Sequence, residues 1–339
     1  MDIIKNLGIS YRGDYINQGS YIEKARKSNE LSTNYTEFVI RNDGKGSFSD
    51  ILSAYYTGNI LLHLPTINTN QTNLKNVKDN VLNLLNNNIK LLIIDASCLS
   101  SEIYDWSTSE EQQNYLKNMA NGIASLCEFN IDIAIENTKK NNEELVFGAT
   151  LSNMSDLLVY TRNALVEKYN YTREQANNRV GISLNLRKLR KTCNTLELNT
   201  WFKVFYNDIK CIKVDDIPNT LDDFNSLLDL VISTNLDVPI ILETKSELEK
   251  IVNEYKKFKF ITNKKLNNKP LNFEGYQEIA DSRYNEYNYN LASSQSGFTN
   301  AVVIIIIVLT VIVAALMILV KFKSWQLLKI IYNIVSCEG

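Results

Sequence analysis

Short apolar runs recur along the chain, and longer segments with helical spacing separate them. Each run is rich in Ile, Leu and Val and is bounded by polar residues, which is the pattern of a buried strand. The eight predicted strands cover residues 6–10, 38–40, 59–64, 90–95, 131–136, 181–185, 210–214 and 238–243. Amphipathic helices are predicted between them, for example over 73–88, 109–128 and 221–234.

This alternation of strands and helices predicts a parallel sheet covered by helices. Eight such units over about 250 residues match the size of a (β/α)8 TIM barrel. A doubly wound open sheet is the alternative, because the second strand is short and weakly marked. No glycine-rich phosphate loop follows any of the strands, which disfavours a nucleotide-binding version of that sheet.

Two of the predicted strands end in a carboxylate. "DIAIE" ends at Glu136 and "VPIILE" ends at Glu243. A buried strand has no need of a charge at its end, but a TIM barrel places its chemistry at the C-terminal ends of its strands. Glu136 and Glu243 are therefore predicted to face the barrel mouth as active-site residues or as remnants of an active site.

The segment 301–320, "AVVIIIIVLTVIVAALMILV", has Thr310 as its only polar side chain. As a helix it would be about 30 Å long, which matches the hydrocarbon core of a bilayer. The predicted organisation is a TIM-barrel domain over 1–258, a stalk over 259–300, a transmembrane helix over 301–320 and a short basic tail over 321–339. The lipid bilayer is thus a predicted partner, and the membrane is the predicted location.

The sequence leaves open which side of the membrane the barrel faces. Lysines follow the apolar segment and acidic residues precede it, which favours a cytoplasmic tail. The N-terminus has no apolar core of a signal peptide, which favours insertion by the tail and a cytoplasmic barrel. The lysines of 255–269 are interpreted as a solvated helix end, with contact to anionic lipid as the alternative.

Composition excludes several classes of protein. The 36 Lys and Arg nearly balance the 38 Asp and Glu, so bulk charge does not favour nucleic acid as a partner. The five cysteines include no CxxC pair and no metal-like spacing, which favours reduced core thiols. The chain has a single histidine, His63.

Several segments in order resemble the xylose isomerase-like barrels, which include endonuclease IV (the family 2 AP endonucleases) and the sugar epimerases. The segments are "LGISYRGDYINQGSYIEKARKSN", "LLHLPTIN", "IAIENT", "GISLN", "IKCIKVDD" and "PIILET". The resemblance spans about residues 6–255. It implies a TIM barrel with metal ligands at the strand ends, and zinc, manganese or magnesium as the metal.

Carried over position by position, the resemblance matches the family's two ligand glutamates to Glu136 and Glu243. The strand-six aspartate falls on Asn185, and the histidine three residues later falls on Lys188. The strand-seven histidine falls on Lys213. A lysine at such a position repels a metal ion, and it would neutralise part of the repulsion between the two glutamates.

Three further positions also depart from the family pattern. The strand-four histidine falls on or beside Asp95, and the strand-one histidine of the endonucleases falls on Ser10. His63 lies in the "H-x-P" element of strand three and is not clearly a ligand. Because a three-zinc centre needs several imidazoles, we expect that the ancestral metal site is lost and that the chain uses no cofactor.

Two classes of function follow. The preferred one is a membrane-anchored, catalytically inactive barrel with a binding or structural role towards a protein or glycan, for example on a viral envelope. The other is a divergent phosphodiesterase or sugar isomerase in which Glu136, Glu243, Lys213 and His63 form the catalytic site.

A purely structural role for the same residues is the alternative. Glu136 and Glu243 would then only form salt bridges with Lys139, Lys213 or Lys245. His63 would be a hydrogen-bonded barrel residue, and Asp215 and Asp216 would cap a loop.

Overall fold

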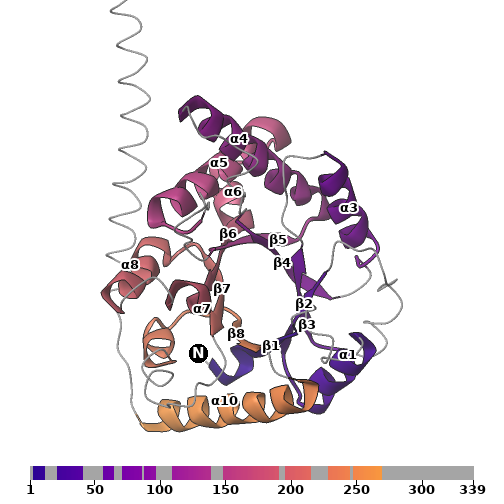
Figure 1. Ribbon diagram of the computed structural model, residues 1–339, viewed down its shortest axis with the longest axis vertical. Coiled ribbons are helices and arrows are strands. Elements are labelled where there is room, and N and C mark those ends of the chain that lie inside the picture. Colours follow the sequence, from indigo (N-terminus) through magenta and orange to yellow (C-terminus); the bar gives the residue numbers. More distant parts are fainter. Residues whose placement is uncertain are drawn as a thin grey trace, which may run out of the picture. The chain divides into compact units, whose positions relative to one another are not determined.

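The computed structural model describes residues 3–11, 21–40, 56–64, 71–85, 88–96, 109–138, 148–190, 195–214, 228–244 and 247–268. Eight parallel strands in chain order close into a barrel, in which β1 pairs with both β2 and β8 (Figure 1). The predicted TIM barrel is confirmed. The open-sheet alternative is wrong, because the first and last strands are hydrogen-bonded neighbours.

Each predicted strand is present, with bounds shifted by a few residues. The strands are β1 (Leu7–Tyr11), β2 (Tyr35–Val39), β3 (Asn59–Leu64), β4 (Ile89–Asp95), β5 (Asp132–Glu136), β6 (Val180–Asn185), β7 (Ile209–Val214) and β8 (Ile240–Thr244). The largest shift concerns β2, which was predicted only over 38–40. Thr36 and Glu37 interrupt its apolar pattern although both are buried.

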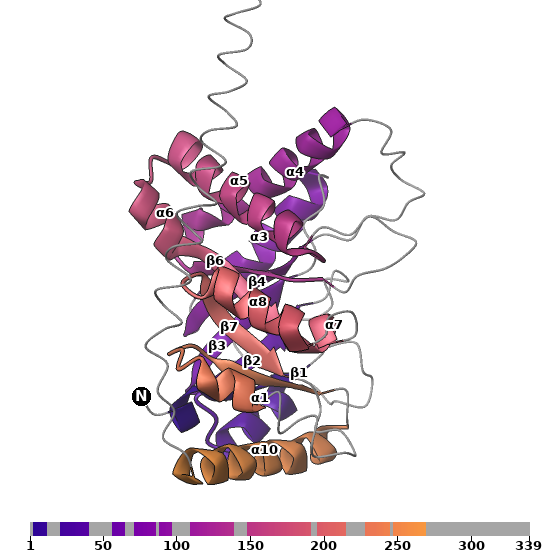
Figure 2. The same cartoon turned by 90° about the vertical axis from the view of Figure 1, so that its left-hand side faces the viewer.

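Helices surround the barrel (Figures 1 and 2). They are α1 (Tyr21–Glu30), α3 (Gln71–Leu82), α4 (Ser109–Ala124), α5 (Leu151–Tyr169), α6 (Arg173–Arg179), α7 (Leu186–Arg190), α8 (Thr195–Phe205) and α10 (Leu248–Asn268), with 3-10 helices η1 (Ile3–Asn6) and η3 (Ser125–Phe129). The predicted helix over 221–234 is described only from residue 228, and residues 228–233 are helical.

Local sequence signals set the ends of α5. Thr150 precedes the helix in an extended conformation, and its side-chain oxygen accepts a hydrogen bond from the backbone N–H of Asn153 at 3.2 Å. Asn170 ends the helix in the left-handed conformation, with φ of 58°. The helix between these caps carries Arg162, whose guanidinium contacts the first residue of β6.

Arg162 is a buried cation at the N-terminal end of the barrel. Its guanidinium lies 2.5 Å from the Asp208 carboxylate, just before β7, and donates to the carbonyl oxygen of Val180, the first residue of β6. The pair ties α5 to the beginnings of two adjacent strands. Because both partners are buried, removing one would leave an uncompensated charge.

The apolar core has two parts. The larger part lies between the strands and the helices, and it includes Leu7, Ile9 and Tyr11 of β1. The smaller part lies inside the barrel and consists of Leu61, Leu91, Ile93, Ala134, Cys211 and Ile241, with Tyr35 packed against it. Gly8 also faces this interior, where an added Cβ would lie 2.5 Å from Ile241 Cδ1 and 2.6 Å from the Tyr35 carbonyl oxygen. Only glycine fits there.

The last described helix, α10, extends beyond the predicted end of the barrel domain at residue 258. Phe258 and Thr262 are buried, and Ile261 and Leu266 pack against the larger core. Within the described ranges no helix is long and apolar enough to cross a membrane. Residues 269–339, which hold the predicted membrane helix and most of the predicted stalk, lie outside those ranges.

Candidate functional site

The barrel interior changes from apolar to polar towards the C-terminal ends of the strands. On five strands, an apolar inward residue is followed two positions later by a polar or charged one. Because strand side chains alternate between the two faces, both residues of each pair face the interior. The pairs are Leu61 and His63, Ile93 and Asp95, Ala134 and Glu136, Cys211 and Lys213, and Ile241 and Glu243.

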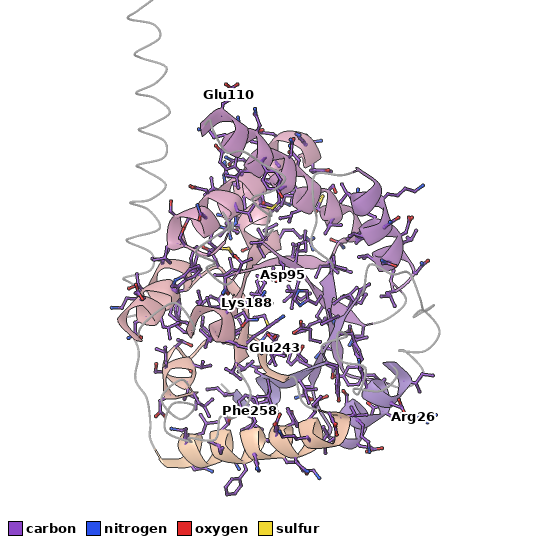
Figure 3. The ribbon with its side chains drawn as sticks, in the orientation of Figure 1. Arg26, Asp95, Glu110, Lys188, Glu243 and Phe258 are labelled. Carbon is purple, nitrogen blue, oxygen red and sulfur yellow. The ribbon has the colours of Figure 1, made fainter. Side chains whose placement is uncertain are left out.

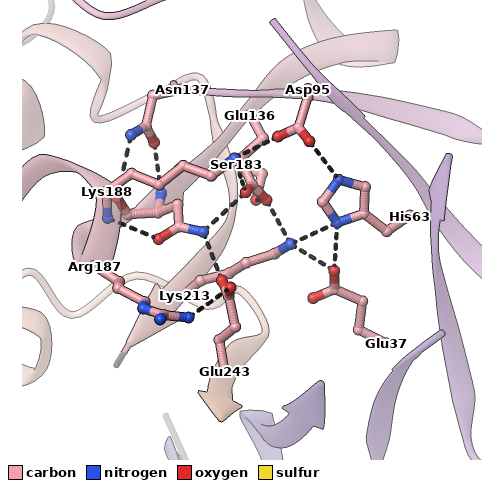
Figure 4. A network of polar contacts seen from close by, with 11 residues as sticks. Glu37, His63, Asp95, Glu136, Asn137, Ser183, Arg187, Lys188, Lys213 and Glu243 are labelled. Atoms are coloured by element: carbon pink, nitrogen blue, oxygen red, sulfur yellow. Dashed lines mark hydrogen bonds and ion pairs between the residues drawn. The ribbon is translucent and has the colours of Figure 1, made fainter. Parts of the chain in front are cut away.

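These polar side chains form one connected set, which we call the mouth network (Figure 4). Its members are Glu37 (β2), His63 (β3), Asp95 (β4), Glu136 (β5), Ser183 and Asn185 (β6), Arg187 and Lys188 (α7), Lys213 (β7) and Glu243 (β8). Asp95, Lys188 and Glu243 lie over the centre of the barrel in Figure 3. The network therefore occupies the place where TIM barrels carry their active sites.

Lys213 reaches across the interior from β7. Its Nζ forms ion pairs with Glu136 and, at 2.6 Å, with Glu37 Oε1. All three side chains are only 1% exposed. The predicted salt bridge between Lys213 and Glu136 is confirmed.

Lys188 supplies a second ammonium group. It lies on α7, directly after β6, and its Nζ pairs with Asp95 and, at 2.7 Å, with Glu136 Oε1. Its side chain is 17% exposed and that of Asp95 is 30% exposed, so the network meets solvent at this pair. Glu136 is thereby held by a different lysine on each of its oxygens.

Asn185 joins the two predicted glutamates. Its side-chain Nδ2 donates to Glu136 Oε1 at 2.8 Å and to Glu243 Oε2 at 2.6 Å. An aspartate here would place a third carboxylate between them, whereas the amide supplies hydrogen atoms to both. The backbone N–H of Lys188 donates to Asn185 Oδ1 at 3.1 Å, which fixes the orientation of the amide. Arg187 Nη1 lies 3.3 Å from the other oxygen of Glu243.

His63 lies between two carboxylates. Its Nδ1 is 2.7 Å from Glu37 Oε1, and its Nε2 is 3.3 Å from Asp95 Oδ2. Burial and the nearby Lys213 lower the pKa of His63, but the carboxylates of Asp95 and Glu136 outweigh them and raise it to about 9. The protonated imidazole has a carboxylate acceptor at each nitrogen, which compensates for the Lys213 Nζ at 3.1 Å from Nδ1.

Cationic side chains hold Glu37, Asp95 and Glu136 in their charged form. Burial opposes ionisation of Glu136, but Lys188 and Lys213 together hold its pKa well below the usual range. Burial also raises the pKa of Asp95. The positive charges of Lys188 and His63 outweigh this effect, so the pKa of Asp95 lies well below its ordinary value. The pKa values of Lys188 and Lys213 are raised, because the surrounding carboxylates outweigh the effect of burial.

The network is balanced in charge. Four carboxylates (Glu37, Asp95, Glu136 and Glu243) face four cations (His63 in its protonated form, Arg187, Lys188 and Lys213). Glu37 Oε2 of the network and Ser10 Oγ of the adjacent β1 are buried and have no hydrogen-bond partner among the described residues. Ser10 pairs in register with Glu37 on β2 and with Glu243 on β8, so it lies beside two of the four carboxylates.

The structure brings together Glu136, Glu243, Lys213 and His63, all four predicted site residues. Glu37, Arg187 and Ser183 were missed. Glu37 carries a detectable signal: a lone acidic residue two positions after Tyr35 and one before a phenylalanine is consistent with the inward face of a strand. Asp215, Asp216, Lys139 and Lys245 lie outside the described residues.

The side chains of the mouth network do not offer a good site for a metal ion. In the described part of the chain, His63, Asp95 and Glu136 are the residues whose ligand atoms lie close enough together to hold one. However, Lys188 pairs with both carboxylates, and Lys213 contacts both Glu136 and His63. A divalent cation would lie within a few ångströms of two ammonium groups. The present donor set therefore does not fit a metal ion.

The closed eight-stranded parallel barrel defines the class of fold, a (β/α)8 TIM barrel, and the solved structures to which it is similar include a xylose isomerase-like TIM-barrel protein. It is similar to the crystal structure of a D-tagatose 3-epimerase-like protein, with a TM-score of 0.53, 16% identity, and coverage of 77% of this chain and 99% of that one. The 3-keto-D-glucoside 4-epimerase YcjR of E. coli gives a TM-score of 0.53 at 11% identity, covering 75% and 98%.

The IOLI protein, whose structure contains a bound zinc atom, gives a TM-score of 0.52 at 11% identity, covering 76% of this chain and 98% of that one. No protein-family model and no curated protein matches the sequence. At these identities the similarity establishes the fold alone.

Proposed function

We propose that the protein is a catalytically inactive barrel of this fold, in which lysine side chains take the place of a divalent cation and which has a binding or structural role at a membrane. One observation carries the proposal: Glu136, the carboxylate matched to a metal ligand, is paired on both oxygens with lysines. Lys213 and Lys188 themselves stand at positions matched to family histidines.

The electrostatics support this reading. Two unit charges of like sign 4 Å apart repel by about 4 kcal/mol at an effective dielectric constant of 20. A divalent ion beside Lys188 and Lys213 would meet that repulsion several times over. The carboxylates are already compensated, so an added cation would also have to displace existing ion pairs.

The protonation states also disfavour acid–base catalysis. A general acid or base works best when its pKa lies near the working pH. The pKa of Glu136 is held well below that range, and both lysines are stabilised as ammonium ions, which are not nucleophiles. These groups are better suited to holding a fixed charge pattern than to exchanging protons.

The membrane role rests on the sequence of residues 301–320, whose length and apolar character fit a bilayer span. The proposed anchor would hold the barrel near a membrane surface through the segment after α10. A protein or glycan at that surface would then be the partner, and the mouth would offer a neutral, hydrogen-bonding floor.

The alternative is a divergent hydrolase or isomerase that uses Glu136 and Glu243. Its support is the shared contact of both carboxylates with Asn185, which holds them close together. The two functions differ in whether turnover exists and whether it depends on Glu136.

The test is metal content together with turnover. The purified full chain, dialysed against zinc or manganese and then against buffer, should contain far less than one metal ion per chain by elemental analysis. It should neither cleave DNA at an abasic site nor epimerise a ketose. One metal ion or more per chain, or turnover that Glu136→Gln abolishes, would overturn the proposal.

A further inference from the structure

The outer face of α10 differs from the rest of the described surface. Its inner face, with Ile251, Tyr255 and Phe258, is buried against the barrel. On the outside, Phe260 is 68% exposed, which is more than the other exposed large hydrophobics of the described chain, Leu82 at 59% and Leu85 at 38%. A helix whose inner face is fully covered has no need of an outward phenylalanine for its packing.

Lysines surround this phenylalanine. Lys256 and Lys257 lie one helical turn before Phe260 and are exposed, and Lys259 adjoins it. From residue 255 to 268 the helix carries five lysines and no acidic residue, whereas the whole chain has a net charge of −2. Of the five, Lys265 pairs with Asp229 at 2.6 Å. Lys256, Lys257 and Lys259 form no ion pair with the described residues.

The sequence after α10 leads to the apolar segment 301–320, for which a bilayer span is proposed. Residues 269–300, a connector of 32 residues, link the helix to the apolar segment 301–320. Even fully extended, a segment of that length reaches about 110 Å at most. If 301–320 spans a bilayer, the barrel is confined to the neighbourhood of its surface, and weak contacts with lipid gain a high effective concentration.

We propose that the outer face of α10 docks on an anionic bilayer surface. Phe260 enters the interfacial region between headgroups and acyl chains, and Lys256, Lys257 and Lys259 meet the phosphate and carboxylate groups of the lipids. Cationic side chains around an aromatic anchor are the combination by which helices bind to anionic interfaces. The inference rests on the proposed anchor only for proximity, since the contacts belong to α10.

The docking has a consequence for topology. Anionic lipids are concentrated in the cytoplasmic leaflet, so a basic docking face places the barrel on the cytoplasmic side. This orientation is opposite to the one suggested by the lysines after residue 320.

The experiment uses the full chain in nanodiscs of phosphatidylcholine, with or without phosphatidylserine, and containing brominated lipid as a quencher. Phe260→Trp introduces a reporter, and its signal is the difference from the parent chain. We expect several-fold stronger quenching in the phosphatidylserine discs, decreasing with added salt. Changing Lys256, Lys257 and Lys259 together to Glu should abolish the difference between the two lipid compositions.

Two matched controls isolate the face. Leu82→Trp places the reporter at the exposed end of α3 and should show no dependence on phosphatidylserine. Changing the exposed Lys75, Lys90 and Lys117 to Glu makes the same change in net charge elsewhere and should leave quenching of Phe260→Trp intact. Equal quenching in both lipid compositions overturns the proposal, as does loss of quenching with the control triple variant. The proposal is also overturned if the parent chain binds duplex DNA more tightly than the phosphatidylserine discs and the change of Lys256, Lys257 and Lys259 to Glu removes that DNA binding.

Resistance of the parent chain to extraction from vesicles by carbonate reports on 301–320 separately. A chain that is extracted, yet shows phosphatidylserine-dependent quenching, refutes the anchor and retains the docking face. A resistant chain without that quenching refutes the docking face and retains the anchor.

Discussion

Lys213 on β7 and Glu37 on β2 meet at 2.6 Å in the barrel interior, although their strands are not neighbours in the sheet. The same ammonium group pairs with Glu136 on β5. One side chain thus links strands on different sides of the barrel. This arrangement makes Lys213 the residue on which the mouth network depends most.

Lys213→Met should destabilise the barrel by about 3 kcal/mol at neutral pH, because the buried Glu37 and Glu136 lose a counter-charge that they share and keep only His63 and Lys188. The pKa of Glu136 lies below its unfolded value, so its contribution to stability is present above the unfolded pKa and is lost as pH falls through the folded pKa. The variant loses the part of that contribution that comes from Lys213, and the difference in stability between the two proteins should shrink on acidification.

Chemical denaturation at several pH values measures this effect. Lys210→Met is the matched control on the same strand, since Lys210 pairs at 2.7 Å with Asp132, whose side chain is 41% exposed. It should cost about 1 kcal/mol or less. A Lys213→Met protein as stable as the parent would contradict the assigned role of Lys213.

Lys213→His should partly restore a divalent metal site with Glu136 and His63 as neighbouring ligands, because it removes one of the two ammonium groups and adds an imidazole. A metal present at 100 times its dissociation constant stabilises a folded protein by about 2.7 kcal/mol. The melting temperature of this variant should therefore rise with zinc or manganese and fall again with a chelator. Lys213→Met, which removes the charge without adding a ligand, should respond less, and the parent chain should not respond at all.

The sequence predicts the barrel well because strand spacing and helix periodicity both follow from burial, as Ile133, Ile135 and Leu184 illustrate. It also predicts the inward direction of Glu136 and Glu243, since both end apolar strands. Glu37 was missed because a strand predicted to begin at residue 38 excludes it. The two-sided pairing of Glu136 was missed for another reason: Lys188 reaches it from α7, whose path after β6 depends on tertiary packing.

His63 should titrate with a pKa of about 9, above its ordinary value. Its protonation then contributes stability that is fully present below pH 6.5 and is lost as pH rises through 9, with a total of about 3 kcal/mol. The chain has one histidine, so a single imidazole resonance in an NMR titration reports this pKa without assignment. Asp95→Asn should lower it. A midpoint at or below 6.5 in the parent chain would be incompatible with the network described.

Arg162→Met should destabilise the barrel by about 3–5 kcal/mol, because Asp208 would remain buried and unpaired. Thermal or chemical unfolding measures the loss. Arg173→Met is the control, since Arg173 is exposed and its guanidinium contacts only the side chain of Asn163 among the hydrogen bonds described. Its effect should stay within about 0.5 kcal/mol. Equal effects of the two substitutions would contradict the structural role of Arg162.

A chain that ends at residue 268 should be clearly more stable than one that ends at 258. The shorter chain lacks Thr262, which is buried, and Ile261 and Leu266, which pack against the core. Removing such apolar contacts costs about 25 cal/mol for each Å² of surface re-exposed. Melting temperatures of the two chains measure the difference. Equal values would place the end of the domain near 258, as the sequence alone predicts.

The ammonium group of Lys213 has one further consequence. A bound metal ion exchanges with its surroundings, so a protein that folds around one gains or loses stability with the local supply of that ion. The positive charge in the mouth of this barrel is instead part of the Lys213 side chain, so it is made together with the polypeptide and remains covalently attached to β7. It has no dissociation constant, and no chelator can remove it.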